Sequence, residues 1–142
     1  MESKRRNLAT EERDYAYIAI DFDNTLVSDL YPEIGLTLNA ESVLQELVER
    51  GHKLILWTIR SGKYLEDAVN WCKNKGIELY GVNENPDFLH DEKSRKVFFD
   101  LVIDDKNIGI PVAGFYDAPR NRIQRVVDWG LLKEELKKLN LL

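Results

Sequence analysis

The sequence contains little of what secreted and membrane proteins depend on. It has one cysteine, Cys72, so no internal disulfide can form and nothing favours an oxidising compartment. No apolar run approaches the roughly 20 residues that a membrane-spanning helix needs. Residues 1–13 are charged and lack an apolar centre, so we predict a polar tail rather than a signal peptide. Together these absences predict a cytoplasmic protein that does not associate with a membrane.

Positive charge is not concentrated anywhere along the chain. The 20 Lys and Arg residues are dispersed among 25 Asp and Glu, and the net charge is −5. Nucleic-acid-binding proteins usually gather basic residues on one face, so a nucleic-acid partner is not expected. An anionic ligand would need local cations or a metal ion to offset the acidic balance. The length of 142 residues fits one globular domain, which we place at residues 14–142.

Short apolar segments alternate with amphipathic ones along the chain. Strands are predicted over 15–20, 53–58, 77–82, 101–103 and 110–115, and helices over 39–51 (with Asn39 as N-cap and Gly51 as stop), 64–75 (ended by Gly76), 120–129 and 131–139. This alternation predicts an α/β fold: a single Rossmann-like, three-layer α/β/α domain with a mostly parallel central sheet. Such sheets bind ligands at the carboxyl ends of their strands.

Polar residues follow the predicted strands at the points where these end. Asp21 and Asp23 follow the first strand, Thr58 the second, and Asp104 and Asp105 the fourth. Carboxylates gathered at one edge repel one another, so a cation is expected among them. Oxygen-only ligands suit Mg²⁺. The sequence therefore predicts a magnesium site that could neutralise a phosphoryl group.

The spacing of the first two aspartates is also informative. Residues two apart at the end of an extended strand point to the same side, so Asp21 and Asp23 can act on the same substrate. One can attack phosphorus while the other donates a proton to the leaving oxygen. Thr58 can donate a hydrogen bond to a phosphoryl oxygen, and a lysine is then needed as a point charge beside the phosphate.

Three motifs in this order resemble those of the haloacid dehalogenase-type phosphatases. Residues 18–26 match an apolar strand followed by Asp-x-Asp-x-Thr, residues 54–58 match an apolar strand followed by Thr, and residues 101–105 match an apolar strand followed by an acidic pair. The resemblance implies a Mg²⁺-dependent phosphatase that hydrolyses a phosphate monoester through an aspartyl-phosphate.

The resemblance also implies a role for each matching residue. Asp21 would be the nucleophile and a Mg²⁺ ligand. Asp23 would be the acid and base, and would ligate the metal through its backbone carbonyl. Thr58 would bind phosphate. Asp104 and Asp105 would bind the metal, and we favour Asp105 as the direct ligand.

Three further residues are candidates for binding phosphate or substrate. The family's lysine is assigned to Lys96, eight residues before Asp104, in preference to Lys93. Asn24, inside the first motif, is a second candidate. Arg60 follows Thr58 by two residues, so it is expected at the same edge, where it could contact a second anionic group of the substrate.

Members of this family often carry a cap domain, but neither usual insertion point leaves room for one here. We therefore expect an open site that takes a bulky phosphorylated substrate or is closed by another copy in a homo-oligomer. Two alternatives stay open: a non-catalytic module that binds a phospho-ligand, and a receiver-like phosphoacceptor. The order of the motifs argues against a receiver, in which the acidic pair follows the first strand.

Overall fold

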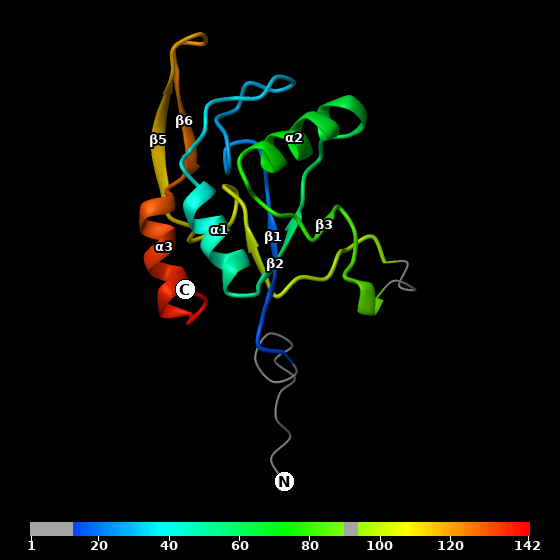
Figure 1. Ribbon diagram of the computed structural model, residues 1–142. Coiled ribbons are helices and arrows are strands. Elements are labelled where there is room, and N and C mark those ends of the chain that lie inside the picture. The colour runs from blue at the N-terminus through cyan, green and yellow to red at the C-terminus, as the bar shows by residue number, and fades with distance from the viewer. Residues whose placement is uncertain (1–12, 90–93) are drawn as a thin grey trace.

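A four-stranded parallel sheet forms the centre of the computed structural model, which describes residues 13–89 and 94–142 (Figure 1). Its order is β3-β2-β1-β4, with β1 at Tyr17–Ile20, β2 at Lys53–Leu56, β3 at Gly81–Val82 and β4 at Leu101–Ile103. The predicted α/β class with a parallel sheet is confirmed. The chain builds outward from β1 in one direction and then returns to its other side, so the switch point lies between β1 and β4.

The strand register brings the strand ends level with one another. Ile20 pairs with both Leu56 and Ile103, the last residues of β2 and β4. Parallel pairing therefore places the residues that follow these strands at one edge. The Asp21 N–H continues the ladder by donating to the Ile103 carbonyl at 2.9 Å.

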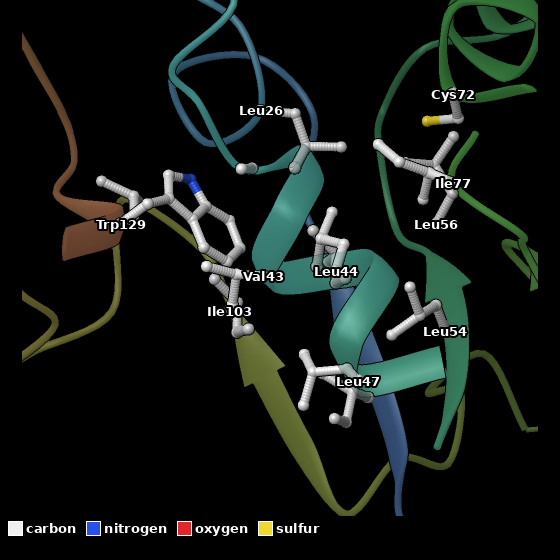
Figure 2. Close-up of a cluster of buried hydrophobic side chains, with 14 of the residues drawn as sticks. Leu26, Val43, Leu44, Leu47, Leu54, Leu56, Cys72, Ile77, Ile103 and Trp129 are labelled. Carbon is white, nitrogen blue, oxygen red and sulfur yellow. The ribbon is translucent and has the colours of Figure 1, made fainter. Parts of the chain in front are cut away.

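The three α-helices bury their apolar side chains in one core on one face of the sheet. These helices are α1 (Glu41–Glu49), α2 (Gly62–Asn74) and α3 (Trp129–Lys138). The core joins alternate strand residues to helix residues, among them Ile18, Ile20, Leu54, Leu56, Ile103, Leu44, Leu47, Cys72, Trp129 and Leu136 (Figure 2). Each fully buried side chain of this kind stabilises the fold by roughly 1.5–3 kcal/mol. Cys72 is buried in this core, and burial raises the pKa of its thiol to about 12.

The helix ends agree with the sequence in part. Gly51 and Gly76 adopt φ values of 95° and 73° just after α1 and α2, the left-handed conformation that ends helices. Asn39 is not the N-cap of α1: it has a φ of 65°, and Ala40 precedes the helix without a capping side chain. Gly130, which separates the helices predicted over 120–129 and 131–139, lies within α3, which begins at Trp129.

The opposite face of the sheet is covered by aromatic side chains. Tyr17 points away from the helical core, and its ring contacts those of Tyr80, Phe88 and Phe98. Phe88 belongs to a short 3-10 helix, η1 (Asp87–Leu89). Among the described residues, this third layer is an irregular segment with one short helix. None of those residues forms a helix long and apolar enough to cross a membrane.

Arg13 belongs to the folded domain and not to the predicted tail. Its guanidinium lies 4.5 Å from the centroid of the Tyr17 ring and 3.1 Å from an Asp100 carboxylate oxygen. Only 11% of its side chain is exposed. The rest of the predicted tail lies outside the described residues.

A β-hairpin takes the place of the helix predicted over 120–129. Strands β5 (Val112–Asp117) and β6 (Arg122–Val127) pair antiparallel as a separate two-stranded sheet. The prediction of a strand near 110–115 is therefore correct, whereas the helix is wrong. Ile123, Val126 and Val127 fit a helical period, but residues 118–121 make a turn that pairs them with β5.

Candidate metal and phosphate site

Three carboxylates meet at the switch point, beyond the ends of β1 and β4. Asp21, Asp104 and Asp105 each offer an oxygen, and these oxygens lie within 4.8 Å of one another. Asp21 comes directly after β1, and the acidic pair comes directly after β4. The three residues predicted to supply carboxylate ligands are therefore brought together.

Thr25 links two of these carboxylates through one hydroxyl. Its Oγ1 donates to Asp21 Oδ2 at 2.8 Å and accepts the Asp105 backbone N–H at 3.1 Å. The Thr25 carbonyl accepts from Trp129 Nε1 at 2.7 Å, and Thr25 is completely buried. The threonine of the first motif thus positions metal-ligand candidates, a role that was not assigned to it from the sequence.

The electrostatics of the cluster favour a bound cation. Burial, and next the charge of Asp104, raise the pKa of Asp21 from 3.8 to about 8. Burial also raises the pKa of Asp105. A divalent cation would remove this penalty, and an all-oxygen donor set fits Mg²⁺.

A cavity of about 400 Å³ opens beside the carboxylates, and we call it the reaction cavity. It is lined by Asp21, Asp23, Asn24, Asp29, Tyr31, Thr58, Ile59, Asp104, Asp105 and Lys106. Five candidates from the first, second and fourth motifs, together with Asn24, therefore share one cavity.

Thr58 is held in place by a residue that the sequence analysis did not single out. Asn83 Oδ1 accepts the Thr58 backbone N–H at 2.9 Å, and Asn83 Nδ2 donates to the Thr58 carbonyl at 3.0 Å. Asn83 directly follows β3, so its position at a strand end was a signal that could have identified it.

Asn24 shapes the turn that follows β1. It adopts a φ of 63°, its Oδ1 accepts the Asp29 N–H at 3.2 Å, and its carbonyl accepts the Val127 N–H at 3.1 Å. It lines the reaction cavity, where it was predicted to bind phosphate.

Arg60 requires a correction, because it does not face a substrate. Its side chain is fully buried, and both Nε and Nη2 donate to the Asp23 carboxylate, at 2.8 and 2.7 Å. The remaining donors reach the carbonyls of Pro32, Glu33 and Tyr64. All five N–H groups of the guanidinium are therefore used inside the protein. Burial alone would lower the pKa of Arg60, but its hydrogen bonds to Asp23 raise it.

The Asp23 carboxylate lies outside the three-carboxylate cluster because it turns toward Arg60. It still lines the reaction cavity, with 21% of its side chain exposed. The contact predicted between its backbone carbonyl and a metal stays a prediction.

Lys96 also requires a correction. It is exposed, and it does not line the reaction cavity. Its segment leads to Asp100, whose N–H donates to the carbonyl of Tyr17 at the start of β1, the end of the strand opposite Asp21. Lys93 lies outside the described residues.

Lys106 is the lysine that the described structure places at the reaction cavity. It follows Asp105 directly, and its backbone N–H donates to Asp104 Oδ1 at 2.9 Å. Its place beside the acidic pair was visible in the sequence, but the spacing used to select a lysine pointed upstream of β4.

Fold and site together define an α/β protein with a four-stranded parallel sheet and a carboxylate cluster at the topological switch point of that sheet. No protein-family model matches the chain, and no curated protein does. A solved structure of a conserved protein from Bacteroides thetaiotaomicron is similar, with 35% sequence identity and a TM-score of 0.70 over 87% of this chain and 91% of that one. The chain belongs to the same family as this Bacteroides protein, whose description names no function.

Proposed function

We propose that this protein is a Mg²⁺-dependent phosphohydrolase that cleaves a phosphate monoester with Asp21 as its nucleophile. The observation that carries the proposal is the convergence of Asp21, Asp104 and Asp105 within 4.8 Å, in a cavity that also contains Thr58. The resemblance of the three motifs to haloacid dehalogenase-type phosphatases supports the same reading.

The first half of the reaction forms a covalent intermediate. An oxygen of Asp21 attacks phosphorus, the bond from phosphorus to the leaving oxygen breaks, and that oxygen takes up a proton. Thr25 fixes Asp21 by donating to Oδ2, so the nucleophile is oriented before substrate arrives. The Thr58 hydroxyl would donate to a phosphoryl oxygen, and the Lys106 ammonium would offset its charge.

The second half releases phosphate. Water attacks phosphorus, the bond to Asp21 breaks, and the water proton passes to a base. We assign the acid and base roles to Asp23, which lines the cavity. Each of its oxygens accepts one N–H from Arg60 and keeps a second lone pair for proton exchange.

A Mg²⁺ ion would be held by Asp21, Asp104 and Asp105, the set in which burial, and next the charge of Asp104, raises the pKa of Asp21. Such an ion would neutralise negative charge on the phosphoryl oxygens. The protein's own contribution is the fixed carboxylate set, which Thr25 and the ladder bond to Ile103 hold in register.

A cytoplasmic location and an open site for a bulky substrate remain part of the proposal. The location rests on the single cysteine, which is buried. The open site rests on the short connections between the motifs, which among the described residues contain α1, α2, β3 and η1 but no separate folded unit.

The test is phosphate release from p-nitrophenyl phosphate with Mg²⁺ and with chelator, for the wild type, Asp21→Asn and Asp14→Asn. Asp14 is exposed and does not line the reaction cavity, so its variant is the matched control. We expect turnover that requires Mg²⁺, vanishes in Asp21→Asn and persists in Asp14→Asn. Turnover that survives Asp21→Asn would overturn the nucleophile, and a single stable phosphorylation without release would indicate a phosphoacceptor.

A further inference from the structure

A second cavity adjoins the reaction cavity on the side of the hairpin, and we call it the hairpin cavity. It measures about 300 Å³ and is lined by Asn24, Asp29, Asp105, Lys106, Arg122, Ile123, Gln124 and Arg125. Four of these residues, Asn24, Asp29, Asp105 and Lys106, also line the reaction cavity. A ligand that occupies one cavity can therefore extend into the other.

Cationic side chains outnumber acidic ones in the lining of the hairpin cavity, which contains Lys106, Arg122 and Arg125 but only Asp29 and Asp105 as acidic residues. Of its two acidic residues, Asp29 is paired with Arg120 at 3.9 Å and with Arg122 at 3.6 Å. The other, Asp105, belongs to the metal cluster. The charge of Lys106 acts on Asp105, but neither Lys106 nor Arg125 forms a close ion pair with any described residue. Three cationic side chains against two carboxylates leave the net charge of this lining positive even without a metal on Asp105, which suits an anion.

The free edge of β6 forms part of the same wall. The Val127 N–H points out of the hairpin toward the Asn24 carbonyl. Backbone groups alternate in direction along an antiparallel strand, so those of Ile123 and Arg125 face the same way. The NMR chemical shifts of these two amides should therefore change when a ligand enters the cavity.

The hairpin is fixed in place before any ligand binds. Gln124 is buried: its Oε1 accepts the Asp29 N–H at 2.8 Å, and its Nε2 donates to the Asp29 carbonyl at 3.0 Å. The same Nε2 donates to Asp117 Oδ2 at 2.9 Å. These bonds tie β5, β6 and the loop after β1 together. The backbone that carries Arg125 in β6 is therefore held in a fixed position.

We propose that the hairpin cavity binds a second anionic group of the substrate, so that the substrate is a phosphate monoester that also carries a further phosphate or carboxylate. Lys106 lies at the boundary between the two cavities, and Arg125 reaches the far group. This inference rests on the proposed function for the identity of the reacting group, but the anion site itself can be tested without turnover.

The binding test uses inorganic phosphate and the amide NMR spectrum of the full chain without Mg²⁺. Under these conditions the acidic cluster disfavours phosphate beside Asp21, so binding reports on the hairpin cavity. We expect saturable shifts of the Ile123 and Arg125 amides, and an affinity that is lower by about tenfold or more in the double variant Lys106→Gln/Arg125→Gln. Arg95→Gln, an exposed arginine in a different cavity, is the control and should bind as the wild type does.

The catalytic test compares fructose 1,6-bisphosphate with fructose 6-phosphate. We expect the ratio of their kcat/KM values to fall by about tenfold in Arg125→Gln and to be unchanged in Arg95→Gln. Absence of saturable shifts, or equal affinity in the double variant, would overturn the anion site. If neither ester is turned over, the NMR titration alone decides whether the anion site exists, and turnover of p-nitrophenyl phosphate decides separately whether the proposed function holds.

Discussion

Arg60 holds Asp23 through two parallel hydrogen bonds, Nε to Oδ2 at 2.8 Å and Nη2 to Oδ1 at 2.7 Å. Such a planar pair fixes the carboxylate in both position and rotation. Three further bonds anchor the guanidinium to backbone carbonyls of the loop after β1 and of α2. Arg60 is therefore a positioning residue for Asp23 and a link between two segments of the reaction cavity.

Replacement of Arg60 should strongly destabilise the folded protein. Arg60→Met leaves the Asp23 carboxylate without its partner and frees two loop carbonyls, so we expect a loss of about 3 kcal/mol or more in the free energy of unfolding. Urea denaturation measures this directly. Arg50→Met is the matched control, because Arg50 is 54% exposed and its pair with Glu46 is 3.6 Å long, so a change of less than about 1 kcal/mol is expected. Equal losses in the two variants would contradict the role given to Arg60.

The Thr25 hydroxyl should couple stability to metal binding. Thr25→Val keeps the shape but removes the donor to Asp21 and the acceptor for the Asp105 N–H. We expect a loss of about 1–3 kcal/mol in stability and a weaker stabilisation by added Mg²⁺. Thr25→Ser, which retains the hydroxyl, should restore most of the Mg²⁺ effect. Thermal unfolding with and without Mg²⁺ measures both, and a Thr25→Val variant that responds to Mg²⁺ as the wild type does would refute the coupling.

The parts of the site that the sequence predicted share one property: each lies directly after a parallel strand. The positions of Asp21, Thr58 and Asp105 could be predicted because β1, β2 and β4 end at the same level of the sheet. The residues that follow these strands therefore lie at one edge. The prediction for Lys96 failed because it depended on the path of the chain between β3 and β4, whose described residues lie on the opposite face and form only the short helix η1, which has no periodicity to reveal it.

Arg60 and the hairpin were misread for a different reason. The edge position of Arg60 was correct, but its burial depends on acceptors from Asp23, Pro32 and Glu33, which are far away in sequence. The spacing of apolar residues in β6 fits a helix as well as a strand, and only its pairing with β5 decides between them. Non-local partners decided both outcomes, and single-sequence patterns do not contain them.

The raised pKa of Asp21 predicts opposite effects of pH on the metal-free and metal-bound forms. The folded state keeps a proton on Asp21 up to about pH 8, whereas the ordinary value is 3.8, so metal-free stability falls as pH rises through this range. Asp21→Asn cannot ionise, so its advantage in melting temperature over the metal-free wild type should grow from pH 5 to pH 8.

The affinity for Mg²⁺ should also depend on pH. Because the ion displaces a proton from Asp21, its affinity for the wild type should rise by up to about tenfold per pH unit below pH 8. Isothermal titration calorimetry in buffers of different ionisation enthalpy measures the released proton. A pH-independent Mg²⁺ affinity, with no proton release, would show that Asp21 is ionised before the metal binds.

His52 should make stability depend on pH at the opposite end of the sheet. Its Nδ1 accepts the Ala16 N–H at 3.0 Å, which leaves Nε2 to donate to the Leu141 carbonyl, also at 3.0 Å. Protonation of Nδ1 would break the first bond, and burial lowers the pKa of His52 from its ordinary 6.5. The contribution of His52 is therefore fully present above pH 6.5 and is lost as pH falls through the lower, folded-state value.

The variant His52→Gln tests this dependence, because glutamine retains a donor and an acceptor but does not titrate. Urea denaturation at pH 7.5 and at pH 5.0 should show that the wild type loses more stability than His52→Gln on acidification. The comparison cancels contributions from His90 and the carboxylates, which both proteins share. An equal loss in the two proteins would mean that the imidazole accepts a proton without giving up its bond to Ala16, and the neutral tautomer assigned to it would then be wrong.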